Sequence, residues 1–290
     1  MQQEGELWPR AASWLQVGQD NCDLAVLGVP AHKTSISETA AHQTPQAIRA
    51  ALTRYSLSST NGSIASLKAL DFGDVVDPDS PEGESRTRDL VSLAAAKSRL
   101  LVALGGDNSI TYAVASGVLD ISGGLITLDA HHDIRTGISN GSPVRRLIEE
   151  FGISGKRIVQ LGINDFSNSP EYAHRAKEYG IHVISRAEIA EIGVKAATQK
   201  ALELVDADTV HVDFDVDVCD RSFVPASPAS APGGISAFEL RSFARYLTED
   251  PSVKSIDITE IDAAQDAADG RTVRLGALLI LEAAAGLLAR

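Results

Sequence analysis

The chain contains few cysteines, no excess of positive charge and no long uninterrupted apolar stretch. Its two cysteines, Cys22 and Cys219, lie far apart in the sequence, which argues against a disulfide framework and makes a reducing cytosol the default compartment. The net charge of −13 argues against nucleic acid and anionic membrane surfaces as partners. We therefore expect a cytoplasmic protein, and its composition leaves small-molecule ligands open.

Three sequence signals of other protein classes are also missing. Residues 1–20 lack the positively charged start and apolar run of a signal peptide. The apolar run over 272–288 is short and carries Arg274 and Glu282, so it predicts a buried helix rather than a membrane span. The turn at 105–109 lacks the lysine and the glycine spacing of a phosphate-binding loop.

Short apolar runs alternate with helical patterns along the chain. Most of these runs are continuously apolar, as expected for strands that are covered on both faces. The alternation predicts a mainly parallel sheet with helices on both sides, in a single domain over 1–290 with a candidate loosely ordered segment at 1–20. Predicted strands cover 24–29, 67–70, 100–104, 124–128, 157–161, 181–184, 209–214 and 253–258, and predicted helices cover 46–52, 86–98, 110–119, 143–150, 170–179, 194–205, 237–248 and 272–288.

Two strings rich in carboxylates follow apolar runs, at 128–133 and 212–217. Alternate side chains of a strand point to the same face, so each string directs several potential ligands toward one point. Crowded carboxylates repel one another and need cations between them, and oxygen and imidazole ligands suit manganese, magnesium, iron or zinc. The sequence therefore predicts a two-metal hydrolase centre. The alternate positions are Asp129, His131 and Asp133 in one string and Asp213, Asp215 and Asp217 in the other.

Some positions near these strings allow more than one interpretation. The second strand is predicted to end close to Asp217, so Asp213 and Asp215 are the favoured ligands and Asp217 stays open. His132 points away from the ligand face and is interpreted as structural or supporting. Cys219 is interpreted as a packed thiol. Asp257 and Glu260, at the end of another strand, are candidates to bind a cationic substrate group or to cap a loop.

Together these strings resemble the ureohydrolase family, which comprises arginase, agmatinase and formimidoylglutamase. The resemblance covers about 24–288 and implies a three-layer α/β/α sandwich around an eight-stranded, mainly parallel sheet, in a protein that forms homo-oligomers (trimers or hexamers). The motifs that carry it are Thr-Pro-Gln-Ala-Ile-Arg at 44–49, Gly-Gly-Asp-Asn-Ser at 105–109, Asp-Ala-His-His-Asp at 129–133, Asp-Phe-Asp at 213–215 and the late Glu260.

The resemblance also implies a set of site residues around two manganese ions bridged by a hydroxide. Asp133 would relay a proton, and Glu260 would pair with the cationic amidinium of the substrate. In the implied ligand set, Asp129 and Asp213 bridge both ions, His131 and Asp215 serve one ion, and Asp133 and Asn108 serve the other.

The chain departs from the family pattern at two positions. Asn108 stands where the family has a metal-binding histidine, and a neutral amide is a weaker donor than imidazole, so one metal site is expected to be weak. Asn140 stands where arginase-like members have a histidine, and an amide is no general acid near pH 7. The second departure argues against an arginase.

The expected substrate is N-formimino-L-glutamate, which the formimidoylglutamase branch converts into L-glutamate and formamide. Arg135 is expected to contact a substrate carboxylate, because guanidinium groups bind carboxylates through two parallel hydrogen bonds. Asn140 and Asn164 are further candidates for substrate contact. One alternative is an agmatinase or another hydrolase of guanidino compounds. A second alternative is a metal-depleted, non-catalytic relative.

Overall fold

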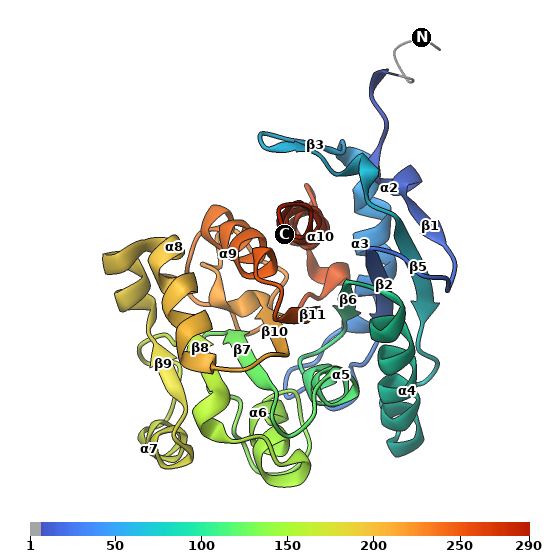
Figure 1. The fold of residues 1–290 in the computed structure, drawn as a ribbon. Helices are drawn as coiled ribbons and strands as arrows, with labels where there is room; N and C mark the ends of the chain where they lie inside the picture. The colour runs from blue at the N-terminus through green and yellow to red at the C-terminus, as the bar shows by residue number, and fades with distance from the viewer. Residues whose placement is uncertain (1–6) are drawn as a thin grey trace.

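The computed structural model describes residues 7–290 and is built around one large sheet (Figure 1). All neighbouring strands of the sheet run parallel, in the order β1-β5-β2-β6-β11-β10-β7-β8-β9. Its nine strands are β1 (Leu15–Val17), β2 (Leu24–Val29), β5 (Ala69–Asp74), β6 (Leu100–Gly105), β7 (Gly124–Leu128), β8 (Ile158–Leu161), β9 (His182–Ile184), β10 (Val210–Asp215) and β11 (Val253–Thr259), and a separate hairpin joins β3 (Ser58–Ser59) to β4 (Gly62–Ser63).

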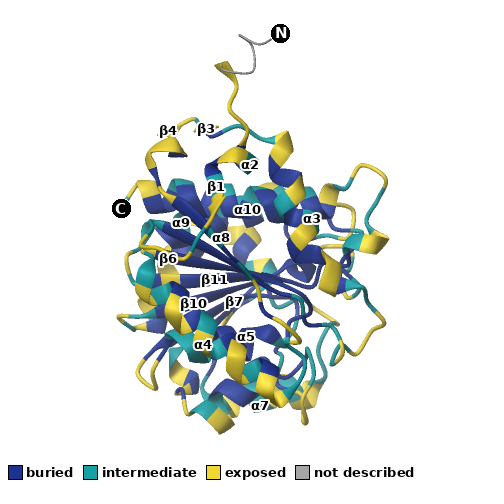
Figure 2. Ribbon diagram, turned by 90° about the vertical axis from the view of Figure 1, so that its right-hand side faces the viewer, coloured by how far each residue is buried: buried dark blue, intermediate teal, exposed yellow. Residues whose placement is uncertain are grey.

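Helices cover both faces of this sheet and complete three layers (Figures 1 and 2). Alternate residues of one strand enter different cores: Leu24 and Val26 of β2 pack on one side, and Ala25 and Leu27 on the other. The helices that pack on the first side are α3 (Thr44–Ala51), α8 (Arg186–Val205), α9 (Ala237–Glu249) and α10 (Arg271–Leu288), and those on the second side are α4 (Pro81–Lys97), α5 (Ile110–Val118), α6 (Pro143–Arg146) and α7 (Pro170–Tyr179).

The predicted three-layer α/β/α architecture is confirmed, and all eight predicted strands are present. The additional strand, β1, lies at the edge of the sheet, and its partly exposed residues give no continuous apolar run. A short helix, α2 (Ala11–Trp14), precedes it. The predicted loose segment at 1–20 therefore includes these two elements, and its first six residues lie outside the described part of the chain.

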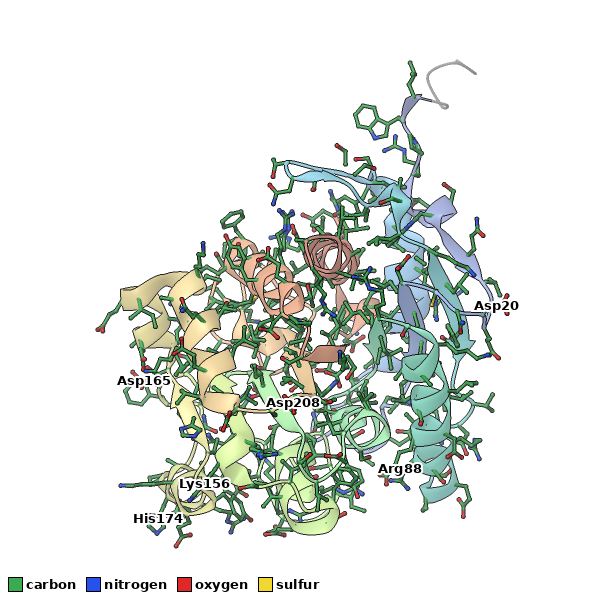
Figure 3. All side chains as sticks on the ribbon, in the orientation of Figure 1. Asp20, Arg88, Lys156, Asp165, His174 and Asp208 are labelled. Atoms are coloured by element: carbon green, nitrogen blue, oxygen red, sulfur yellow. The ribbon has the colours of Figure 1, made fainter. Side chains whose placement is uncertain are left out.

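The helices differ from the prediction mainly at their ends. α8 begins eight residues early, because Ser185 accepts a hydrogen bond from the backbone N–H of Glu188 and starts a first segment that kinks at Gly193. α10 is largely buried, as predicted, and none of the helices in residues 7–290 has the length and apolarity that crossing a membrane requires. Polar side chains such as Lys156 and His174 lie at the margin of the molecule (Figure 3).

The turn between β6 and α5 depends on a close approach of two backbone segments. A Cβ atom added at Gly106 would lie 2.0 Å from the carbonyl oxygen of Ala31, which is backbone and cannot move aside. The carbonyl of Gly106 also accepts a hydrogen bond of 3.0 Å from the N–H of Glu260. Gly106 thus connects the turn before α5 to the loop after β11.

We predict that Gly106→Ala lowers the free energy of unfolding by about 1–3 kcal/mol, the usual range for overpacking. Denaturant unfolding followed by circular dichroism measures the change. Gly18→Ala is the matched control, because its added Cβ would meet only Leu70 side-chain atoms at 3.6 Å. Equal stabilities of the two variants would contradict the prediction.

Candidate metal centre

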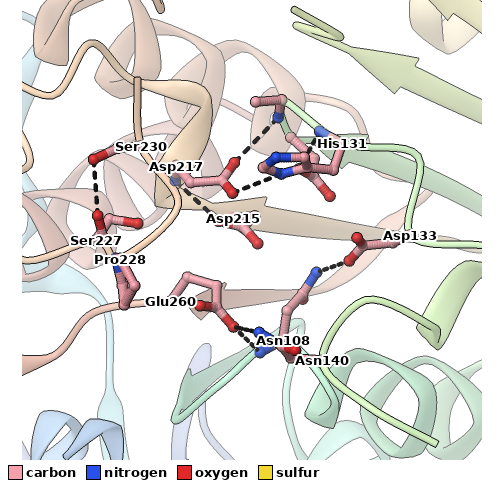
Figure 4. A network of polar contacts seen from close by, with 12 residues as sticks. Asn108, His131, Asp133, Asn140, Asp215, Asp217, Ser227, Pro228, Ser230 and Glu260 are labelled. Atoms are coloured by element: carbon pink, nitrogen blue, oxygen red, sulfur yellow. Dashed lines mark hydrogen bonds and ion pairs between the residues drawn. The ribbon is translucent and has the colours of Figure 1, made fainter. Parts of the chain in front are cut away.

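The carboxylate strings meet where β7 and β10 end. These strands are adjacent and parallel, with Leu128 opposite Phe214, so the residues that follow them emerge at the same edge of the sheet. Two groups of three side chains form there, and within each group the potential ligand atoms lie within 4.8 Å of one another. Figure 4 labels four of these side chains, His131, Asp133, Asp215 and Asp217. The first group is Asp129, His131 and Asp217, and the second is Asp129, Asp133 and Asp215.

The carboxylates from the string at the end of β10 that join the two groups are not the predicted pair, Asp213 and Asp215. Asp215 and Asp217 join the two groups, and Asp213, a predicted bridging ligand, belongs to neither. Asp213 lies one pleat deeper in the sheet, opposite Asp257 of β11, and its Oδ1 is 3.4 Å from the hydroxyl of Thr259. The alternating pattern alone does not locate the edge of the sheet, which decides which carboxylates lie in the two groups. Oδ2 of Asp213 is also buried without a hydrogen-bond partner among the described residues, and its role as a ligand stays a prediction.

A short turn keeps Asp217 on the ligand face. After β10 the chain forms a 3-10 turn over Val216–Val218, and the backbone N–H of Asp217 donates a 2.9 Å hydrogen bond to Oδ1 of Asp215. The side chain of Asp217 then reaches His131, with 2.8 Å between Oδ2 and Nδ1. The signal for Asp217 was present in the sequence, as the third carboxylate at the same two-residue spacing.

The electrostatics of the metal-free site show how crowded it is. Burial, together with the charges of neighbouring carboxylates, raises the pKa of Asp129 and of Asp215 well above the ordinary range. Burial also opposes protonation of His131, but the charges of Asp217 and Asp129 outweigh this effect and raise its pKa to about 12. The site therefore favours positive charge between its carboxylates.

Buried oxygen atoms without partners support a fit to metal ions. Oδ2 of Asp129 is buried and has no hydrogen-bond partner among the described residues. A buried carboxylate oxygen in this state is unfavourable unless a cation is bound to it. Asp133 and Glu260 also adopt backbone φ angles of 51° and 60°, a strained conformation that accompanies functional sites. The donor set of four aspartates and one histidine suits a pair of ions such as manganese.

Asn108 lies at this site, but its amide is oriented differently from a metal ligand. Its Nδ2 donates a 2.6 Å hydrogen bond to Oδ2 of Asp133. Its Oδ1 accepts hydrogen bonds from the hydroxyls of Thr111 (2.6 Å) and Thr259 (3.2 Å). The predicted ligand oxygen is therefore engaged elsewhere, and the amide would have to rotate to offer it to a metal.

Asn140 and Glu260 form a second amide–carboxylate contact. Oε1 of Glu260 accepts hydrogen bonds from Nδ2 of Asn140 (2.9 Å) and from the backbone N–H of Asn108 (2.8 Å). Oδ1 of Asn140 accepts a hydrogen bond from the N–H of Ile36, so this amide joins three loops. Burial and the charge of Asp107 raise the pKa of Glu260 to about 8.

A cavity of about 360 Å³ opens above these groups. Arg135, Asn140 and Glu260 line it, as expected for residues that contact a substrate. Asn164 does not, because it lines a separate small cavity with Asp165 and Arg186. The other residues that line the main cavity are Ile36, Ser37, His131, Asp133, Ile134, Gly141, Ser167, Asn168, Ser169, Tyr172, Asp215, Asp217, Pro228 and Ala229.

Comparison with known proteins identifies the family of this chain. A family model described as the arginase family matches residues 22–286. The chain belongs to the arginase family.

Three comparisons concern formimidoylglutamases from two organisms. The chain is 34% identical to formimidoylglutamase of Bacillus subtilis (strain 168), over 93% of this chain and 89% of that protein. The crystal structure of the Bacillus subtilis enzyme superposes with a TM-score of 0.89 at 32% identity, covering 96% of this chain and 92% of that one. Formiminoglutamase of Trypanosoma cruzi, solved with Mn²⁺, gives a TM-score of 0.90 at 23% identity over 98% of this chain and 99% of that one, which shows the shared fold.

Two amide side chains that the sequence did not indicate hold the ligand loop of this arginase-family protein. Asn168 donates through Nδ2 to the carbonyl of Ala130 (2.9 Å) and accepts through Oδ1 from the N–H of His132 (3.0 Å), so it braces the backbone around His131. Gln160 contacts both the ring and the carbonyl of His132, which fits the predicted supporting role of that histidine. An isolated amide inside a strand, such as Gln160, or in the loop after it, such as Asn168, carries no sequence signal for such a role.

We predict that Asp217→Asn lowers metal affinity at least about tenfold more than Asp213→Asn, because ligands contribute more than the residues that support them. Metal titration by calorimetry measures both variants. A second readout needs no metal: Asp217→Asn should lower the pKa of His131, as measured by NMR, because it removes a charge 2.8 Å away. A larger effect of Asp213→Asn in both measurements would restore Asp213 as the ligand.

Proposed function

We propose that the chain is a dinuclear manganese hydrolase that cleaves N-formimino-L-glutamate into L-glutamate and formamide. The observation that carries this proposal is the charge of the cavity lining, which contains four carboxylates (Asp133, Asp215, Asp217 and Glu260) and, among the described lining residues, one lysine or arginine, Arg135. Such a cavity suits a substrate with a cationic amidine at one end and carboxylates at the other. The name of the Bacillus subtilis relative supports the same substrate.

Asp129, His131, Asp133, Asp215 and Asp217 would hold two ions in this proposal, with Asp129 common to both groups. When bound, divalent cations supply Lewis acidity that activates water near neutral pH. Nδ2 of Asn108 holds the carboxylate of Asp133 in place by donating a hydrogen bond to it.

The side chains of the cavity have separate roles in the reaction. Glu260 pairs with the amidinium, and this positive charge favours the ionised form of a carboxyl whose pKa burial has raised. Asp133 is placed on the cavity wall to accept a proton from the attacking water and pass it to the departing amine of glutamate. Arg135 binds a carboxylate at the far end of the substrate.

The first alternative function differs from this proposal in the charge of its substrate, and the second differs in the number of bound metal ions. Agmatine is a dication, and its ammonium group would face Arg135, so like-charge repulsion disfavours it. A non-catalytic relative would retain fewer than two ions per chain, whereas the five clustered ligands favour two. We also propose a single domain, a cytoplasmic location and a trimeric or hexameric assembly, which rest on composition and on the family resemblance.

We predict manganese-dependent release of L-glutamate from N-formimino-L-glutamate, with agmatine turned over at least about tenfold less efficiently, the effect of one unfavourable charge contact. Product analysis with added manganese and after chelation measures this. Preferential turnover of agmatine would favour the agmatinase alternative. Fewer than two bound ions together with no activity would favour the non-catalytic relative.

We predict that the metal-free protein becomes less stable as the pH rises from about 4 to about 8. The pKa of Asp133 is raised from 3.8 to about 7 and that of Glu260 from 4.5 to about 8, mainly by burial. In this window the folded chain binds more protons than the unfolded chain, so the free energy of unfolding falls with rising pH. Thermal melts of chelated protein measure this trend, and added manganese should reverse it. A pH-independent gap between the two forms would contradict the prediction.

A further inference from the structure

Arg135 differs from Arg145 and Arg146, which also follow the string at 129–133, in the contacts of its side chain. Arg145 forms ion pairs with Glu149 and Glu150, and Arg146 forms ion pairs with Glu84 and Glu150. The guanidinium of Arg135 has no ion pair or hydrogen bond with any described residue. It lines the cavity and is therefore available to bind an anion.

Backbone contacts fix the starting point of the Arg135 side chain. Its N–H donates to the carbonyl of Gly141 (2.9 Å), and its own carbonyl accepts from Nε of Arg145 (2.7 Å). The side chain then crosses Gly141 so closely that a Cβ atom at that position would lie 2.7 Å from Cδ of Arg135. The absence of a side chain at Gly141 thus leaves the space that the Arg135 side chain occupies.

Tyr172, in the first turn of α7, lies near the guanidinium of Arg135. The guanidinium carbon of Arg135 is 5.9 Å from the centroid of its ring, within the range of a cation–π contact. The guanidinium carbon of Arg175 is 5.5 Å from the same centroid, and Nη1 of Arg175 donates to the carbonyl of Ile134 (3.1 Å). The ring therefore contacts two cations, and Arg175 also ties α7 to the residue before Arg135.

We propose that Tyr172 is a specificity-determining residue that positions Arg135 to bind a substrate carboxylate. The inference rests on the proposed function and identifies the group that makes the cavity selective for acidic amidines. Tyr172 acts through Arg135, at the end of the substrate remote from the amidine carbon. Its removal therefore weakens the binding of acidic substrates and leaves the chemical step unchanged.

The test compares two substrates that share the amidine and differ in the carboxylates: N-formimino-L-glutamate and N-propylformamidine. We expect Tyr172→Leu to raise KM for the first substrate by about threefold to tenfold, the size of a cation–π contact, without changing kcat. KM for N-propylformamidine should stay constant. Tyr172→Phe retains the ring and should restore KM to near its original value. Tyr179→Leu is the matched control, because this tyrosine lies on the same helix and contacts Glu149 outside the cavity.

A double variant separates positioning from packing. Tyr172→Leu added to Arg135→Met should raise KM no further, because the ring then has no guanidinium to position. Additive effects, or an equal rise in KM for both substrates, would overturn the role of Tyr172. If the unaltered protein hydrolyses neither substrate, the proposed function fails and calorimetric binding of L-glutamate decides the inference. Weaker binding by Tyr172→Leu than by Tyr172→Phe supports it, and equal binding overturns it.

Discussion

Repulsion among buried carboxylates at the edge of β7 and β10 is the constraint on which the site depends. A parallel sheet covered on both faces excludes water from its strand ends, so burial raises the pKa of Asp129 and of Asp215. The protein relieves this repulsion only in part, because His131 sets one positive charge beside Asp129 and Asp217 while Oδ2 of Asp129 has no partner among the described residues. Cations relieve it, and the same burial that makes the empty cluster unfavourable strengthens the attraction to bound ions.

The surrounding structure holds the cluster together against this repulsion. Asp133 and Glu260 keep positive φ angles, and such strain persists only where neighbouring contacts fix the backbone. Asn168 contacts the backbone on both sides of His131, and the N–H of Glu260 donates to the carbonyl of Gly106, while Asn140 holds the Glu260 side chain. Because each of these amides donates and accepts at the same time, each ties two segments together while adding no charge to an already crowded site.

The sequence predicted the architecture well, because parallel strands buried on both faces give continuous apolar runs, and these runs locate the strands. The side chains of the first string, 129–133, meet at the candidate metal centre because this string follows its strand directly. The structure leaves Asp213 outside both ligand groups, because the end of β10 is decided by a turn and by the pairing with β11, which lie outside the local pattern. The loop after β8 likewise places Asn164 beside a separate small cavity and brings Asn168, which the sequence did not indicate, to the main one.

Asn108 shows how a neutral side chain can serve at a position where a histidine would ligate a metal. Its amide now donates to Asp133 and accepts from two threonine hydroxyls. Hydroxyls donate and accept hydrogen bonds, so a rotated amide could donate to Thr111 and Thr259 and turn its oxygen toward the metal site. The hydrogen bonds of the threonines would survive this rotation, and only the bond to Asp133 would be lost. Competition between Asp133 and a metal ion for the amide therefore decides how strongly that ion is held.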